Sequence, residues 1–245
     1  MNFRKRDYLA FIPVAGLIAA SMIWLDLPAA TFFRALGRDM PELVAPFKAM
    51  TDLGKSQWYL YPAGIAALLA FAAMRLQPQR RAAWRRRMQI AGFIFADIAA
   101  SGLIVDGLKI LIGRPRPVLL AEGIFNQFAP LSFHARWWSF PSGHAATMLA
   151  LALAIGCIVP RLRWPMLLFT GITAGSRIIV AAHYPADVIG GLAVAAVTHT
   201  LLLAWFVRRG WDGWRGEGFA SHIEDFSPCR PAADPLHKPD DAAQT

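Results

Sequence analysis

The chain has 245 residues, of which 56% are hydrophobic and 17% charged, and its formal net charge is +9. A typical soluble domain is about 45–50% apolar and about 25% charged, so this composition indicates either a very large core or a membrane protein. Apolar runs of about 20 residues favour the membrane. A basic chain can also bind nucleic acid, but these arginines cluster between apolar runs, which argues against that partner. The spacing of the two cysteines, Cys157 and Cys229, suggests neither a metal site nor a disulfide framework.

Six apolar segments predict helices, and the first covers residues 8–25. This run follows Arg4, Lys5 and Arg6 and is longer than the apolar core of about 7–15 residues in a cleaved signal peptide, so we expect a retained helix. The fourth segment is short and needs its flanks to complete a span. Together the segments predict an all-α, polytopic membrane protein with a bundle of six transmembrane helices. The other five segments cover residues 57–74, 88–112, 144–159, 165–182 and 185–207.

Basic residues orient this bundle, because cytoplasmic loops carry an excess of lysine and arginine. The loop at residues 75–87 is the strongest determinant, and it predicts that both termini are cytosolic. Tryptophans near the helix ends agree with an aromatic belt at both interfaces, with Trp211 assigned to the inner one. The short, arginine-rich loops favour a bacterial inner (plasma) membrane. The inner segments contain Arg4, Lys5, Arg6, Arg75, Arg80, Arg81, Arg85, Arg86, Arg87, Arg161, Arg163, Arg208 and Arg209.

Three stretches remain outside the predicted membrane helices. Residues 26–56 alternate apolar and charged side chains, which suits an amphipathic helix along the membrane interface. Residues 113–143 form a second outer segment. Residues 209–245 contain four prolines among acidic and small residues, which predicts disorder. We therefore expect a membrane domain over residues 1–208 and a disordered cytosolic tail over residues 209–245.

Polar clusters fall at the outer ends of the predicted helices, and one group of residues supplies cations. Lys109 ends the third helix, and Gly113 and Pro115 break the helical path so that Arg116 turns back towards the bundle. Arg177, at the end of the fifth helix, adds a second guanidinium group. Lysine offers a point charge, and arginine offers a planar fork of donors that suits phosphate oxygens. Three cations directed at one place indicate an anion with several charged oxygens.

The sequence Pro141-Ser142-Gly143-His144 has the pattern of a helix start. Serine is a favoured N-cap, proline suits the first turn, and glycine lets a ligand approach the backbone closely. The free N–H groups of a helix N-terminus form an anion site. Ser142 and Gly143 can therefore hold phosphate oxygens, while His144 can give a proton to a leaving oxygen.

His183 and Asp187 are four residues apart. If the sixth helix begins near His183, both side chains lie on one face; if it begins at Pro185, their contact needs a local bend. In either case Asp187 can hold one imidazole nitrogen and leave the other free to attack. An imidazole oriented in this way is a candidate nucleophile for phosphorus.

Each cluster alone has a structural explanation. Lys109 could be a snorkelling helix-end lysine, His183 and Asp187 a buried polar pair, and Arg116 and Arg177 ligands of lipid headgroups. Their occurrence together, in order and on one predicted membrane face, favours a shared site.

Other polar residues inside the apolar segments receive structural roles. We expect Asp106 to pair with Lys109, three residues further along the same helix. Asp97 is a functional candidate by its depth in the third segment, but a structural role is favoured. Thr198 and His199 are expected to be interhelical hydrogen-bond partners.

The three clusters together resemble the signature of the type 2 phosphatidic acid phosphatase superfamily. Every signature position is filled, by Lys109, Arg116 and Pro117, by Pro141, Ser142, Gly143 and His144, and by Ser176, Arg177, His183 and Asp187. The resemblance implies that His183 is the nucleophile, Asp187 its orienting partner and His144 the acid and base. It also implies a six-helix bundle whose site opens sideways to the outer leaflet and needs no metal or cofactor. The phosphate-binding residues would be Lys109, Arg116, Ser142, Gly143 and Arg177.

The expected function is hydrolysis of a phosphomonoester or diphosphate of a membrane lipid, through a phosphohistidine, at the periplasmic face. The candidate lipids are undecaprenyl diphosphate, phosphatidylglycerophosphate, phosphatidic acid and lipid A, and the sequence does not choose among them. One alternative is a lipid phosphotransferase that uses the same histidine. Another is a non-catalytic lipid-binding or transport protein, which would need the cations but not His183, Asp187 and His144. The only partner inferred is the phosphorylated lipid, with no nucleic acid and no obligate protein.

Overall fold

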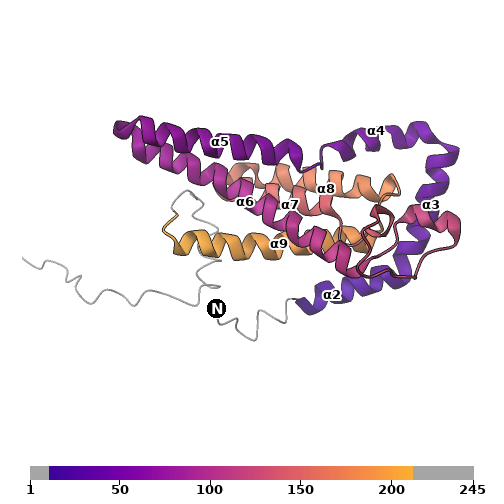
Figure 1. The fold of residues 1–245 in the computed structure, drawn as a ribbon. Coiled ribbons are helices and arrows are strands. Elements are labelled where there is room, and N and C mark those ends of the chain that lie inside the picture. Colours follow the sequence, from indigo (N-terminus) through magenta and orange to yellow (C-terminus); the bar gives the residue numbers. More distant parts are fainter. Residues whose placement is uncertain (1–10, 212–245) are drawn as a thin grey trace, which may run out of the picture.

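The computed structural model describes residues 11–211, and every regular element in that range is helical (Figure 1). The all-α class is therefore confirmed for the described residues. The elements are α2 (Phe11–Ala20), the π-helical turn η1 (Ser21–Leu25), α3 (Asp26–Asp39), α4 (Pro41–Asp52), α5 (Gln57–Leu76), η2 (Pro78–Arg80), α6 (Arg81–Ile112), η3 (Pro117–Glu122), η4 (Ala135–Trp137), α7 (Gly143–Ile158), η5 (Pro160–Leu162), α8 (Arg163–Ile179) and α9 (Pro185–Arg208).

The predicted apolar segments coincide with α2 and η1, α5, α6, α7, α8 and α9. Four stretches of the described chain are long and apolar enough to cross a membrane: Ile12–Asp39, Pro41–Leu76, Pro78–Glu122 and Pro185–Arg208. Helix α7 has 16 residues and α8 has 17, and about 20 are needed to cross the hydrocarbon core. The count of six crossings therefore stays a prediction.

Helix α6 ends at Gly113, where the chain turns back towards the bundle. Gly113 has φ 61°, in the left-handed region, and its N–H bonds to the carbonyl of Lys109 at 2.9 Å. A Cβ at this position would lie 1.7 Å from the carbonyl oxygen of Ala129, so the close approach of these two loop segments requires glycine. The turn brings Arg114 and Arg116 back to the end of the helix that they follow.

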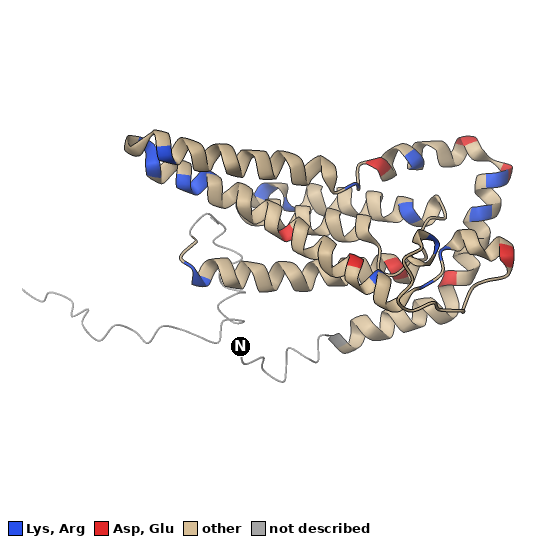
Figure 2. Ribbon diagram, in the orientation of Figure 1, with Lys and Arg blue, Asp and Glu red and all other residues tan. Residues whose placement is uncertain are grey.

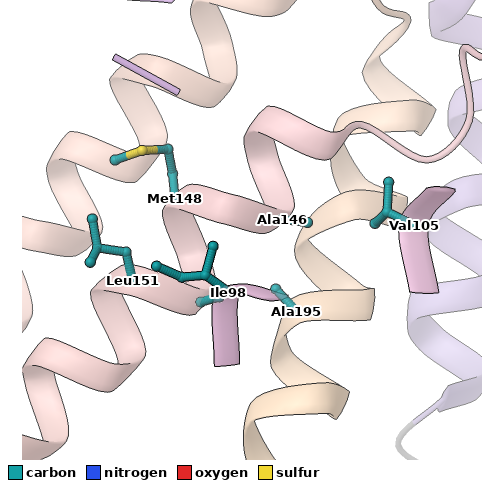
Figure 3. Packing of buried hydrophobic residues seen from close by; sticks show 7 residues of the cluster. Ile98, Val105, Ala146, Met148, Leu151 and Ala195 are labelled. Carbon is teal, nitrogen blue, oxygen red and sulfur yellow. The ribbon is translucent and has the colours of Figure 1, made fainter. Parts of the chain in front are cut away.

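Helix α7 lies at the centre of the bundle, in contact with α6, α8 and α9 (Figure 1). Small residues allow this close approach, because van der Waals packing rather than hydrophobic burial drives helix association in a membrane. The main core cluster joins α6, α7 and α9 (Figure 3) and consists of Ile98, Val105, Ala146, Met148, Ala150, Leu151 and Ala195.

The two ends of the bundle differ in character. The basic residues around the α5–α6 connection lie at one end, and α3, α4 and the loop after α6 lie at the other (Figure 2). The arginine-rich loop and the three signature clusters are therefore well separated, as the sequence predicts. Which end faces the cytosol stays a prediction.

The structure bears on two further expectations. The outer segment at residues 26–56 contains two helices, α3 and α4, instead of one, and Asp26 is completely buried. Trp211 is 3% exposed and its ring centroid lies 4.5 Å from that of Phe93, so its side chain is buried in the protein, and its place at the inner interface stays a prediction. Neighbouring aromatic side chains pack against Trp211 just after the end of α9 and bury it. The predicted tail from residue 212 onwards lies outside the described residues.

Candidate active site

His183 and Asp187 meet at the start of α9. The helix begins at Pro185, so His183 precedes its first turn, yet the Nδ1 atom of His183 lies 3.4 Å from Oδ2 of Asp187. The local bend that this contact requires is present, because the N–H groups of Ala182 and His183 both bond to the carbonyl of Arg177, at 3.0 and 3.2 Å. Both side chains are buried, and Nε2 of His183 is left as the nitrogen that can attack.

Asp187 is held from four directions. Its Oδ1 accepts a hydrogen bond from the Arg114 guanidinium at 2.6 Å. Its Oδ2 accepts bonds from the Ser139 hydroxyl at 2.5 Å and from the Tyr184 N–H at 2.9 Å, besides facing His183. The bond to Tyr184 also caps α9, as an acidic residue in the first turn of a helix often does. The carboxylate is therefore fixed in position and compensated in charge.

The start of α7 packs directly against this group. Ser142 is the N-cap of α7, with its hydroxyl accepting from the Ala145 N–H at 3.5 Å, as predicted from the sequence. The N–H of Ser142 bonds to the carbonyl of Asp187 at 2.8 Å. A Cβ on Gly191 would lie only 2.3 Å from the Ser142 carbonyl oxygen, so glycine in α9 allows the two helix starts to touch.

The predicted phosphate ligands gather around the start of α7. The Lys109 ammonium would lie 3.2 Å from a Cβ placed on Gly143, so glycine leaves room for this cation beside the helix N-terminus. Lys109 also pairs with Asp106 at 2.8 Å, as the sequence predicts. The half-buried imidazole of His144 lies within the electrostatic reach of Arg177, His183, Lys109 and Arg116. The structure thus brings the eight predicted site residues together near the starts of α7 and α9.

The end of α4 and the turn that follows it pack against Arg177 and His144. Thr51 accepts a hydrogen bond from the Arg177 guanidinium at 3.2 Å, and its hydroxyl lies 2.8 Å from that of Ser176. Gly54 lies against His144, since a Cβ added there would be 2.7 Å from the Cδ2 atom of the ring. The other guanidinium, of Arg116, is held by a bond of 3.4 Å to the carbonyl of Trp138.

The charge state of His183 follows from its surroundings. Burial lowers its pKa below the ordinary value, and the positive charges of Arg177 and Arg116 act in the same direction. The hydrogen bond and the negative charge of Asp187 oppose this shift. The net lowering of the pKa favours the neutral form of His183, which is the form of imidazole that can act as a nucleophile.

Sequence reasoning missed four residues of the site. Arg114 is 2% exposed and bridges Asp187 to Asp26, and its guanidinium also lies 4.5 Å from the centre of the Tyr184 ring. Ser139 and Thr51 were not singled out either. Arg114 could have been predicted from the sequence, because it lies between Gly113 and Pro115, in the same turn as Arg116. Nothing in the local sequence of Asp26 indicates a partner 88 residues away.

A second buried polar cluster lies deeper in the bundle. Nδ1 of His199 lies 2.5 Å from Oδ2 of Asp97, and Nε2 of His199 lies 3.5 Å from the Cys157 sulfur. These residues come from α9, α6 and α7, which agrees with the interhelical role expected for His199.

Comparisons with known proteins agree with the signature. The chain is 34% identical over 179 residues to a lipid A 1-phosphatase of Rhizobium johnstonii, covering 67% of this chain and 71% of the relative. It is 33% identical over 215 residues to the lipid A 1-phosphatase of Rhizobium etli, covering 80% and 86% of the two chains. It is also 36% identical over 106 residues to the undecaprenyl-diphosphatase BcrC of Bacillus subtilis, covering 42% of this chain and 52% of the relative. A family model described as the PAP2 superfamily matches residues 91–211, the part of the chain that carries all three clusters, and the chain belongs to that superfamily.

Proposed function

We propose that this protein is a membrane lipid phosphatase that removes a phosphate group from lipid A by way of a phosphohistidine at His183. The arrangement that favours this reaction most is the buried contact of 3.4 Å between His183 and Asp187, with His144 and three cations around it. A site that only bound anionic lipids would need the cations but not an oriented imidazole. We also propose that the chain crosses the membrane several times and that the site lies at the periplasmic face.

In the first step, Nε2 of His183 attacks phosphorus while Asp187 holds Nδ1–H. The bond between phosphorus and the lipid oxygen breaks, and His144, which enters this step as the imidazolium, gives one proton to that leaving oxygen and becomes neutral. The negative charge of the bound phosphate favours the imidazolium form of His144 in the substrate complex. The phosphoryl oxygens would be bound by Lys109, Arg116 and Arg177 and by the backbone N–H groups at the start of α7.

In the second step, a water molecule attacks the phosphohistidine, and His144 now acts as the base that takes its proton. The bond between phosphorus and Nε2 breaks, inorganic phosphate leaves, and neutral His183 is restored. The cations and the helix N-terminus stabilise the charge on the transferring group in both steps, which is the task that magnesium performs in many other phosphoryl-transfer enzymes. We therefore expect turnover without a metal ion.

Lipid A is favoured as the substrate because two relatives with that activity match over most of their length. A diphosphate of a polyprenyl lipid is the second candidate, because BcrC is similar over a shorter stretch. Both are phosphate esters on an apolar anchor, and both suit a site at the end of a membrane bundle.

The test is phosphate release by the purified full-length protein in detergent. Lipid A, undecaprenyl diphosphate, phosphatidylglycerophosphate and phosphatidic acid would be compared with a chelator present. We expect release from lipid A by the wild type and none by His183→Ala. His134→Ala, which changes an exposed histidine in the loop after α6, should behave like the wild type.

The remaining outcomes separate the alternatives. Release from undecaprenyl diphosphate alone would replace the substrate but keep the chemistry. Phosphate that appears on an added acceptor lipid instead of in solution would indicate a phosphotransferase. Binding of the lipids without any reaction would indicate a non-catalytic protein, and release that survives His183→Ala would show that the nucleophile is wrong.

A further inference from the structure

The catalytic pair His183–Asp187 is connected to the N-terminal part of the chain by a buried chain of charges. The Arg114 guanidinium donates one hydrogen bond to Asp187 and another to Asp26, each at 2.6 Å. The side chains of all three residues are at most 3% exposed. Asp26 follows the π-helical turn η1, and it lies well before residues 91–211, which are the part matched by the family model.

Asp26 makes further contacts that fix its position. Its Oδ1 accepts bonds from the Ser21 hydroxyl at 2.9 Å and from the Ala186 N–H at 3.0 Å. Ala186 is in the first turn of α9, next to Asp187, so Asp26 also satisfies a free N–H group at the start of that helix. The N-terminal segment thus holds both the arginine that contacts Asp187 and the helix that carries Asp187.

The charges of this group have a chemical consequence. Two carboxylates and one guanidinium carry a net charge of about −1 when Asp26 and Asp187 are ionised. If Asp187 alone contacted Arg114, the pair would be neutral, and Asp187 would offer less stabilisation to a positive charge on His183. With Asp26 present, the guanidinium is shared between two carboxylates, and the excess negative charge remains beside the imidazole.

We propose that Asp26 is a positioning residue of the active site, which acts through Arg114 so that Asp187 keeps enough negative charge to orient His183 and to stabilise it as it becomes positive. This inference rests on the proposed function, because it takes His183 as the nucleophile. Asp26 lies outside the family segment, whereas Arg114, Asp187 and His183, on which it acts, lie within it.

The charged and titratable groups that face His183 come from four parts of the fold. They are Asp187 at the start of α9, Arg177 in α8, Arg116 after α6 and His144 in α7. Asp26 and Arg114 act on His183 through Asp187. A substitution at Asp26 leaves the first four in place, so a change in the titration of His183 reports on the added negative charge.

The experiment compares Asp26→Asn with the wild type in the full-length protein. Three quantities are measured. Two are kcat and KM with the lipid that the wild type hydrolyses. The third is the titration midpoint of His183, observed by NMR of histidine-labelled protein, with His183→Ala to assign the signal. We expect kcat to fall about tenfold, KM to change less than about threefold, and the midpoint to fall by about half to one pH unit. Asp26→Glu, which keeps the charge, should restore the midpoint.

The matched control is Asp39→Asn. Asp39 is an exposed partner of Arg38 near the end of α3, and it should change none of the three quantities. If Asp26→Asn does not fold, Ser21→Ala decides, because loss of the hydroxyl that bonds to Asp26 should produce a smaller shift of the midpoint in the same direction.

Other results would overturn the inference. An unchanged kcat, or a lower kcat with an unmoved midpoint, would mean that Asp26 only stabilises the fold. The two proposals fail in different ways: hydrolysis that survives His183→Ala removes the proposed nucleophile, whereas an inactive His183→Ala beside an unaffected Asp26→Asn removes only the role of Asp26.

Discussion

Residues 11–211 contain two buried histidine–aspartate pairs, and α9 contributes to both. His183 and Asp187 lie at its first turn, while His199 lies 12 positions beyond Asp187, about 18 Å along the helix, and pairs with Asp97. By distance alone the deeper pair is the better one, at 2.5 Å against 3.4 Å. A close contact between imidazole and carboxylate therefore does not identify the catalytic pair.

The surroundings of the two pairs differ. Asp187 accepts hydrogen bonds from Arg114 and from the backbone N–H of Tyr184, and Arg116 and Arg177 act on His183. The guanidinium groups of Arg116 and Arg177 offer sites for an anion.

His199 lies inside α9, where the helix itself uses the backbone N–H groups, and its neighbours are the Cys157 thiol and the Phe93 ring. One oxygen of Asp97 has no hydrogen-bond partner among the described residues. Under the proposed function, the histidine–aspartate pair that acts in catalysis is the one with cations and a helix N-terminus nearby. The pair among apolar side chains instead connects three helices.

The largest difference between the pairs should appear in turnover. Asp187→Asn keeps the size of the side chain but removes the charge that orients His183, and we expect kcat to fall about 10³–10⁴-fold, as for other oriented histidines. Asp97→Asn should change kcat by less than about threefold. The measurement is phosphate release by both folded variants, and similar losses in the two would contradict the distinction between the pairs.

A second prediction concerns the turn between α4 and α5, which packs against His144. Gly54→Ala would place a methyl group 2.7 Å from the ring of His144 and must move that ring or the α4–α5 turn. Because misplacement of a catalytic group by about 1 Å can cost about 10²-fold, we expect kcat to fall about 10- to 100-fold with little change in stability. Gly92→Ala in α6 is the control, since an added Cβ meets nothing within 4 Å there. Full activity in Gly54→Ala would show that the turn does not position His144.

A third prediction concerns the deeper pair, where stability should change and catalysis should not. His199→Leu leaves Asp97 buried without its partner, and we expect a loss of about 1–2 kcal/mol in the free energy of unfolding in detergent. The double variant Asp97→Leu/His199→Leu removes both polar groups and should recover most of that loss. If the double variant were less stable than His199→Leu, the interaction between His199 and Asp97 would stabilise the protein by more than the cost of burying Asp97 without a partner.

The same comparison shows what the sequence can predict. Part of the candidate site follows from short patterns, because a helix N-cap and a helix-ending glycine each depend on neighbours within a few residues. Ser142 and Gly113 behave as those local rules predict, and His183 meets Asp187 through the bend that a helix start at Pro185 requires. The helical segments were predictable for a similar reason, since apolar runs of this length have few other solutions in a membrane.

The parts that could not be predicted depend on contacts between distant segments. In the sequence, Asp26 is a single acidic residue after an apolar run. Only the packing of α3 against the end of the bundle makes it a partner of Arg114. Trp211 is similar, because its burial depends on Phe93, far away in α6. Thr51 meets Arg177 across 126 positions of sequence. Without a second sequence to compare, no local pattern reports such pairings.

The smallest predicted effect is that of mild acid on the catalytic pair. Burial, with Arg177 and Arg116, lowers the pKa of His183, so the neutral nucleophile should persist below the ordinary histidine value of about 6.5. We therefore expect less than about half of the neutral His183 to become protonated between pH 7.5 and pH 6.5. The protonated fraction should rise steeply only at lower pH.

The phosphate group of the substrate also titrates near pH 6, so the pH dependence of the rate alone would mix two ionisations. The titration midpoint of His183, measured by NMR on the free enzyme, separates them. A midpoint clearly below about 6.5 is the expected result. A midpoint at or above that value would mean that the negative charge of Asp187 outweighs burial and the two guanidinium groups, and that the catalytic histidine is held as a cation in mild acid. The electrostatic difference between the two histidine–aspartate pairs would then lie in Asp187 itself and not in the cations around it.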